Sequence, residues 1–156
     1  MQGQRFVTVR TDYHNPDFKA LVKKLDAELN LRDGSDHGFY HQFNGIEGLD
    51  QVVVAYEGSI PVACGAIKPF GADRMEIKRM FVLPKYRGQG VSQKVIRALE
   101  VWAKESGMAC CVLETGKRQP EAIAFYRKSG YVQIENYGPY HGIENSLCFE
   151  KRFKEG

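Results

Sequence analysis

A short loop with two glycines and two cations is the part of the sequence best suited to bind an anion. Residues 82–92 read VLPKYRGQGVS and lie between an expected strand and an expected helix. Gly88 and Gly90 let the backbone approach a ligand and adopt positive φ. Free N–H groups at a helix start suit a phosphate, and Lys85 and Arg87 add charge beside them. These residues fit a bound phosphate and an ordinary turn with a solvated basic rim about equally well.

Two familiar nucleotide-binding motifs do not fit this loop. The dinucleotide fingerprint G-x-G-x-x-G would need a glycine at position 93, where the chain has Gln93. A Walker A loop would need Gly-Lys and then serine or threonine after its glycines, and the loop lacks that sequence. A phosphate bound here would therefore belong to another kind of ligand.

The loop closely resembles the acetyl-CoA signature of the GNAT superfamily of N-acetyltransferases. Residues 87–92, RGQGVS, follow the pattern Q/R-x-x-G-x-G/A except at Ser92, which is small and able to cap the helix. A second register, which starts at Lys85, keeps both glycines. The resemblance implies that the pyrophosphate of CoA contacts this loop, at Arg87, Gly88, Gln89, Gly90, Val91 and Ser92.

A second block strengthens the resemblance. Residues 119–131, QPEAIAFYRKSGY, look like the GNAT pattern N-x-x-A-x-x-x-Y-x-x-x-G-F/Y, with Gln119 in place of the usual asparagine. Gln119 is therefore the expected polar contact to CoA at that site, although the exchange weakens this assignment. The resemblance implies acetyl-CoA as co-substrate, no metal, and a mixed α/β sheet of the GNAT fold.

The family chemistry assigns roles to further residues. In GNAT enzymes the strand before the loop separates from its neighbour at a bulge, and its N–H groups polarise the thioester carbonyl. Here those donors would be Met80, Phe81 and Val82. Tyr126 matches the tyrosine that protonates the departing CoA thiolate. The acceptor amine attacks directly, so no covalent enzyme intermediate is needed.

The base that deprotonates the amine is less clear from the sequence. Glu76 lies on the strand before the loop, where several GNAT members place a carboxylate. It is the expected base, but a structural role, such as an ion pair with Arg79, competes with that interpretation. Glu114 at the end of the next strand is the rival, and His41 is a third candidate.

Composition limits the remaining possibilities. The 156 residues favour a single domain over 1–156, with 43% hydrophobic and 26% charged residues. A net charge of +3 is too weak to imply a nucleic-acid partner. The beginning lacks a signal-peptide core, and the longest apolar stretch, Ile60 to Ile67, is too short to span a membrane. The four cysteines form no C-x-x-C pair, so buried reduced thiols and a cytoplasmic location are expected.

Hydrophobic periodicity and turn residues predict the elements that position these side chains. The expected order is β-α-α-β-β-β-α-β-α-β-β. The first helix follows an Asn15 N-cap, and the second, over Asp36 to Phe43, is the least well defined. The expected strands lie over Arg5 to Arg10, Gln51 to Tyr56, Ile60 to Ile67, Arg74 to Leu83, Ala109 to Thr115, Tyr131 to Ile134 and Ser146 to Phe153. Helices over Ser92 to Ser106 and from Pro120 to Gly130 complete the set.

Acceptor recognition is the least specified property. The aromatic segment Asp36 to Asn44 lies where the family has its acceptor lid, and Tyr137 to Ser146, with Tyr140, is the expected opposite wall. The favoured acceptor is the primary amine of a small molecule or amino acid. Alternatives are a protein lysine or N-terminus, and a non-catalytic acyl-CoA-binding module. Homodimers are common in the family, although no residue of this sequence indicates one.

Overall fold

The computed structural model describes residues 5–33 and 45–154. Seven strands, three helices and two short 3-10 turns follow in the order β1 Val7–Thr11, α1 Pro16–Asp33, β2 Gln51–Glu57, β3 Ile60–Phe70, β4 Arg74–Val82, η2 Pro84–Tyr86, α3 Val91–Glu105, β5 Cys110–Gly116, α4 Pro120–Lys128, β6 Val132–Ile134, η3 Gly138–Tyr140 and β7 Ser146–Arg152. The predicted order matches this one except for its second helix, Asp36 to Phe43, which lies outside the described residues, and the turns η2 and η3, which were not predicted.

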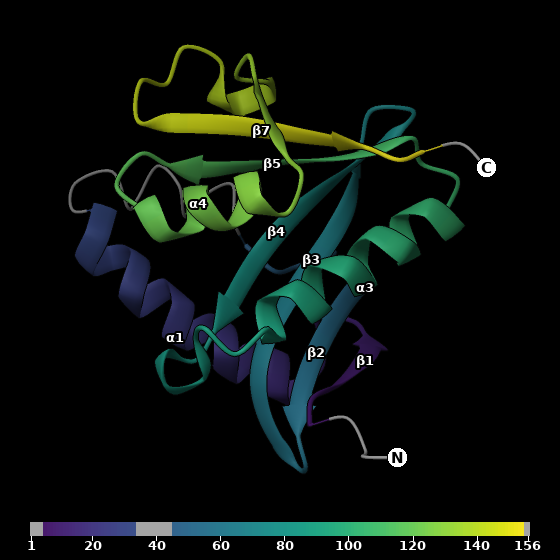
Figure 1. Cartoon of the computed structure of the whole chain (residues 1–156), viewed down its shortest axis with the longest axis vertical. Coiled ribbons are helices and arrows are strands. Elements are labelled where there is room, and N and C mark those ends of the chain that lie inside the picture. The colour runs from purple at the N-terminus through teal and green to yellow at the C-terminus, as the bar shows by residue number, and fades with distance from the viewer. Residues whose placement is uncertain (1–4, 34–44, 155–156) are drawn as a thin grey trace.

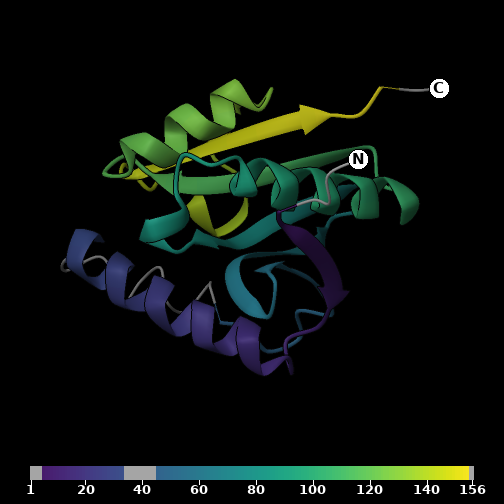
Figure 2. The same ribbon diagram turned by 60° about the horizontal axis from the view of Figure 1, so that its bottom comes forward.

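The strands form one mixed sheet in the order β1-β2-β3-β4-β5-β7-β6. Among the strands of the described residues, only β4 and β5 pair in parallel, as expected for strands joined through the crossover helix α3. Figures 1 and 2 show α3 and α4 on one face of the sheet and α1 on the other. The α/β class predicted from the sequence is confirmed.

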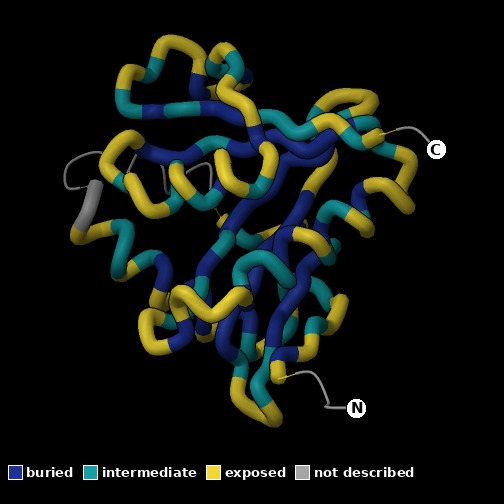
Figure 3. The backbone as a smooth tube through the Cα atoms, in the orientation of Figure 1, coloured by how far each residue is buried: buried dark blue, intermediate teal, exposed yellow. Residues whose placement is uncertain are grey.

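The central strands are buried on both faces, which explains their nearly continuous apolar runs. In β2, Val53 and Ala55 pack into the core beneath α3, whereas Val52 and Val54 pack beneath α1. Figure 3 shows the buried positions running along these strands, with exposed residues in the turns and on the outer helix surfaces. None of the helices within the described ranges is long and apolar enough to cross a membrane.

The predicted N-cap of α1 is present. The side-chain oxygen of Asn15 accepts hydrogen bonds from the N–H groups of Asp17 (2.8 Å) and Phe18 (3.0 Å), which would otherwise lack partners at the helix start. Phe18, Leu21 and Leu25 then bury one stripe of the helix against the sheet. The capped helix therefore lies across β2, β3 and β4.

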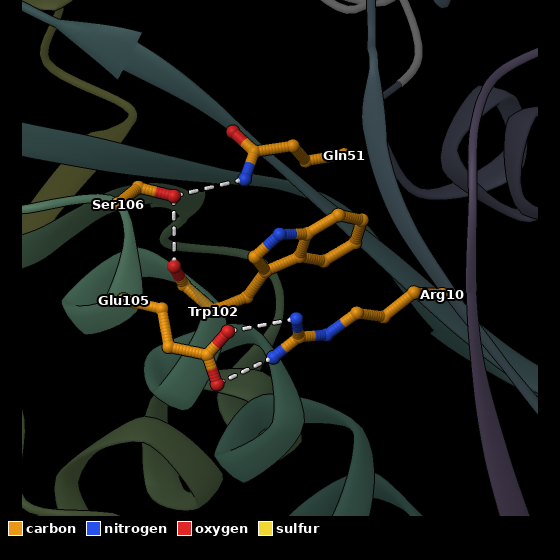
Figure 4. Close-up of polar contacts among 5 residues, drawn as sticks. All are labelled: Arg10, Gln51, Trp102, Glu105 and Ser106. Carbon is orange, nitrogen blue, oxygen red and sulfur yellow. Dashed lines mark hydrogen bonds and ion pairs between the residues drawn. The ribbon is translucent and has the colours of Figure 1, made fainter.

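A polar cluster connects β1 and β2 to the end of α3 (Figure 4). Arg10 donates two hydrogen bonds to Glu105, at 2.8 and 2.9 Å, and its guanidinium lies 4.7 Å from the centre of the Trp102 ring. Gln51 donates to the hydroxyl of Ser106 at 3.2 Å. Because these groups are largely exposed, this cluster adds little to stability compared with the core.

The strands β4 and β5 separate after a short parallel stretch. Their pairing ends at Glu76 and Val112, whereas β5 stays paired with β7 as far as Gly116. On the other side of β4 the register with β3 shifts, because Arg79 and Met80 occupy the span opposite a single residue of β3. Arg79 has φ of +57°, and no other described non-glycine residue has a positive φ. This β-bulge bends β4 away from β5 and opens the gap between them.

Candidate functional site

Two cavities meet where β4 leaves β5. The larger has a volume of about 650 Å³ and runs along the loop after β4, the start of α3 and one side of α4. The smaller has a volume of about 110 Å³ and lies between the first half of β4, the end of β5 and η3. Both are lined by Leu25, Met80, Gln119, Ala122 and Tyr126. A ligand in the larger cavity would therefore reach a ligand in the smaller one at this junction.

The glycine loop forms one end of the larger cavity. Gly88 has φ of +76° and Gly90 has φ of +84°, which is the left-handed region that favours glycine. Neither glycine has a heavy atom within 4 Å of where a Cβ would lie, so backbone conformation rather than crowding requires them. The open space above both glycines and the N-terminus of α3 fits the pyrophosphate that the sequence predicts there.

One expectation about the loop is wrong. Ser92 does not cap α3, because Gly90 is the N-cap residue and no side chain caps the helix. Ser92 lies one residue too far into the first turn for that role, and it lines the larger cavity instead. The N–H groups at the helix start are therefore free of a side-chain cap and can donate hydrogen bonds to a ligand.

The structure brings most of the predicted CoA contacts to the larger cavity. The residues that line it include Met80, Phe81, Val82, Arg87, Gly88, Gly90, Val91, Ser92 and Gln119. Gln89 is the exception, since its side-chain amide donates to the carbonyl of Lys85 at 2.9 Å. Gln119 is the N-cap residue of α4, but its side chain makes no capping hydrogen bond.

The positive charge of Arg87 is already paired. Its Nη2 lies 2.7 Å from an oxygen of Glu28 on α1, and its Nε donates to the carbonyl of Val82 at 3.1 Å. Both side chains of the ion pair remain about a third exposed, so the pair is weak and can exchange partners. Arg87 thus links α1 to the loop as well as lining the cavity.

The smaller cavity is lined by charged side chains. Glu76 is 4% exposed and accepts a hydrogen bond from the hydroxyl of Tyr137 at 2.8 Å. Its other oxygen lies 3.6 Å from the ammonium of Lys78, which is itself 3.5 Å from the hydroxyl of Tyr140. Glu114 lines the same cavity from β5. Glu76 and its rival Glu114 therefore face one space, and the geometry keeps both as candidate bases.

Several partners in this cavity were not expected. The ion pair suggested for Glu76 with Arg79 is absent; Glu76 pairs with Lys78, and Arg79 pairs with Asp26 on α1. Alternation along β4 places Glu76 and Lys78 on one face, so the Lys78 contact could have been found from the sequence. The Arg79 contact could not, because it depends on the bulge.

Tyr126 lies at the junction of the cavities. It is 8% exposed, and its ring packs 5.3 Å from Phe125 and 6.0 Å from Tyr131. Burial, together with the nearby charge of Glu114, raises the pKa of Tyr126 well above its usual value. The hydroxyl therefore stays protonated at neutral pH, as a proton donor must.

The remaining candidates fall partly outside the described residues. His41 and the expected lid segment, Asp36 to Asn44, lie outside the described residues. Tyr140, on the expected opposite wall, does line the smaller cavity. Among residues 5–33 and 45–154, no three His, Cys, Asp or Glu side chains gather in a metal-binding arrangement.

Known proteins resemble this chain in sequence and architecture. The sequence model of the Acetyltransferase (GNAT) family matches residues 12–131. The chain is 37% identical to the IAA acetyltransferase of Azospirillum brasilense over 133 residues, which cover 84% of this chain and 87% of that protein.

Solved structures agree. A structure from Klebsiella pneumoniae described as an acyl-CoA N-acyltransferase superposes with a TM-score of 0.79 at 26% identity, covering 94% of this chain and 97% of that one. A Bacillus anthracis protein described as a streptothricin acetyltransferase, solved with acetyl coenzyme A, has a TM-score of 0.60 at 25% identity, covering 67% and 62%. The chain therefore belongs to the acetyltransferase (GNAT) family and is an N-acetyltransferase.

Proposed function

We propose that this enzyme transfers the acetyl group of acetyl-CoA directly to the primary amine of a small molecule or amino acid. The observation that carries the proposal is the meeting of a cavity of about 650 Å³ with one of about 110 Å³ at Tyr126. The first falls in the range of ligand-sized pockets, which is about 300–1,000 Å³, and the second lies below it. Two cavities of unequal size suit a large acyl donor and a small acceptor.

The larger cavity would hold CoA. The pyrophosphate would bind at the start of α3, because unpaired N–H groups at a helix start bind anions. The residues that would contact it are Gly88, Gln89, Gly90, Val91 and Ser92. Arg87 adds positive charge at the same end, and Gln119 contacts the CoA chain where GNAT enzymes usually have asparagine. The donor supplies an activated acetyl thioester, and the protein supplies its position.

The acyl carbonyl would lie beside the freed edge of β4. After Glu76 this edge has no pairing with β5, and Met80, Phe81 and Val82 line the larger cavity. Backbone N–H groups held in place there would stabilise negative charge that develops on the carbonyl oxygen. No reorganisation of the strand would be needed at the moment of reaction.

Two proton transfers complete the reaction. A primary amine has a pKa of about 10, so it must lose a proton before it can attack. We assign Glu76 as the group that accepts this proton, directly or through water, with Glu114 on the same cavity as its rival. Tyr126 would donate its phenolic proton to the sulfur as CoA leaves.

We also propose that residues 1–156 form one domain that works in the cytoplasm. The continuous sheet and the family match over 12–131 support a single domain. All four cysteines are free and buried, which suits a reducing compartment.

An amine panel tests the proposed function. The purified protein would be incubated with acetyl-CoA and with amino acids, simple amines, lysine-containing peptides and peptides with free N-termini, while free thiol release is followed. We expect turnover with at least one small amine and far less with peptides. Turnover with peptides alone would support protein acetylation instead, and no turnover with any amine would support a non-catalytic role.

A further inference from the structure

The smaller cavity has positive as well as negative charge on its wall, and this limits which amines suit it. We propose that the acceptor carries a carboxylate next to its amine, as a free α-amino acid does, and that Lys78 and Arg79 bind this carboxylate. The inference rests on the proposed function, because it concerns the acceptor side of the same site. It narrows the acceptor from primary amines in general to zwitterionic ones.

Two cations at adjacent positions of β4, Lys78 and Arg79, line one cavity beside the bulge. Successive side chains of a regular strand point to opposite faces, so Lys78 and Arg79 would normally diverge. In this structure both line the smaller cavity, and Arg79 adopts a φ of +57° where the register with β3 shifts. Adjacent cations on the wall of a cavity, beside a strained bulge, suit the recognition of an anion.

Arg79 has a donor that no group among residues 5–33 and 45–154 satisfies. Its side chain is 2% exposed, and its terminal nitrogen pairs with Asp26 on α1. The Nε–H, however, is buried and finds no hydrogen-bond acceptor within the described residues. Buried polar groups are nearly always hydrogen-bonded, so this donor calls for an acceptor that the described part of the chain does not supply. A carboxylate oxygen is the strongest such acceptor.

Lys78 supplies the second cation. Its side chain is 5% exposed, and its ammonium lies 3.6 Å from a Glu76 oxygen and 3.5 Å from the Tyr140 hydroxyl. Both distances are longer than an ordinary hydrogen bond, so neither contact is tight. A buried ammonium is costly to keep charged, and a substrate carboxylate beside it would offset part of that cost.

The charges of the whole cavity also favour a zwitterion. Two carboxylates, Glu76 and Glu114, line it together with two cations, Lys78 and Arg79. A polyamine would suit a predominantly negative wall, whereas this wall offers partners of both signs. Glu114 lines this cavity together with Tyr126, which marks the junction where the amine must react. The carboxylate of the acceptor would then contact Lys78 and Arg79.

Matched acceptors test the inference. Each of the common amino acids would be compared with its α-carboxamide and with the amine lacking the carboxylate, by thiol release from acetyl-CoA. Values of kcat/KM are calculated per concentration of neutral amine, since the three amines differ in pKa. For the best amino acid, we expect the carboxylate form to exceed the amide by about 10- to 100-fold, as a charge-assisted hydrogen bond would provide. The amide also mimics a peptide N-terminus, so it covers the protein-acetylation alternative.

A variant and a control locate the preference. Lys78→Met also removes a contact of Glu76, so both acceptors can lose rate, but kcat/KM for the amino acid should fall about 10-fold or more further than that for the amide. Lys68→Met is the control. Lys68 is an exposed residue of β3 that lies opposite Glu76 in the sheet but does not line the cavity. This variant should therefore keep the wild-type preference for the carboxylate.

The outcomes separate this inference from the proposed function. Amides or simple amines acetylated as well as amino acids would overturn the inference and leave the proposed function standing. Equal loss on both acceptors in Lys78→Met would also overturn it. No thiol release with any amine would overturn both. If Lys78→Met does not fold, calorimetry on the wild type in the presence of CoA decides: an N-acetylated amino acid must bind more tightly than its amide.

Discussion

At the residue scale, the hydroxyl of Tyr126 is the group on which the proposed chemistry depends most. Tyr126→Phe removes one oxygen and almost no packing, so acetyl-CoA should bind nearly as well while kcat falls by about 100-fold or more. Tyr131→Phe is the matched control, because it removes a neighbouring buried hydroxyl that donates to Glu100 and lines neither cavity. If the Tyr126 variant turns over at the wild-type rate while chemistry is rate-limiting, the general-acid role is wrong.

The pH dependence of turnover should report the same hydroxyl. Burial first, and Glu114 second, raise the pKa of Tyr126, so the phenol keeps its proton to higher pH than free tyrosine. The basic limb of kcat should therefore lie above pH ~10, the ordinary pKa of tyrosine. Glu114→Gln removes the negative charge and should move this limb to lower pH. A limb that stays in place or moves upward in Glu114→Gln would contradict this account.

Glu76 is the proposed base, and its buried partners make the assignment testable. Glu76→Gln keeps the size and can still accept the Tyr137 hydrogen bond, but it cannot take a proton. We expect kcat to fall by about 100-fold or more near neutral pH, with a changed acidic limb. Rates would be compared for Glu76→Gln and Glu114→Gln. A large loss confined to the Glu114 variant would transfer the role to Glu114.

At the element scale, the turn between β4 and α3 determines whether CoA can be held. A side chain at Gly90 must adopt φ near +84°, at a cost of about 1–2 kcal/mol, and the carboxylate of Gly90→Asp also repels a pyrophosphate. We expect a folded protein with strongly weakened CoA binding, measured by calorimetry. Gly107→Asp is the control, since Gly107 has φ of +86°, equally open space and no place in either cavity.

The two variants separate backbone strain from ligand repulsion. Both should lower the melting temperature by a similar amount, but only Gly90→Asp should affect CoA. Unchanged CoA affinity in a folded Gly90→Asp protein would mean that the loop does not bind the pyrophosphate.

At the scale of the whole molecule, the cysteines report whether the core is closed. Burial raises the pKa of Cys64 and of Cys111 to about 12, and that of Cys148 to about 11. A raised pKa keeps the reactive thiolate scarce near pH 8. We expect the native protein to react very slowly with a thiol reagent such as dithiobis-nitrobenzoate, and all four thiols to react after denaturation. One fast thiol in the native state would show that part of the core opens readily.

The sequence alone predicts most elements, because local patterns encode them. Asn15 before Pro16 marks the start of α1, and the structure confirms that cap. Strand and helix bounds differ from the prediction by no more than three residues, as β3 shows by continuing to Phe70 rather than ending at Ile67. Ser92 was misjudged because the position of an N-cap depends on the exact turn geometry, which the glycines set here.

The sequence determined the family, the glycine loop and the position of Tyr126, since each is carried by residues close together in the chain. Only the tertiary structure decided the surroundings of Glu76, whose hydrogen-bond donor, Tyr137, lies 61 residues away. The tertiary structure alone placed Lys78 and Arg79 on one cavity and showed the bulge beside them. Periodicity encodes which face of an element is buried. Register shifts and the separation of strands arise from packing among distant segments, and these shaped the acceptor side of the site.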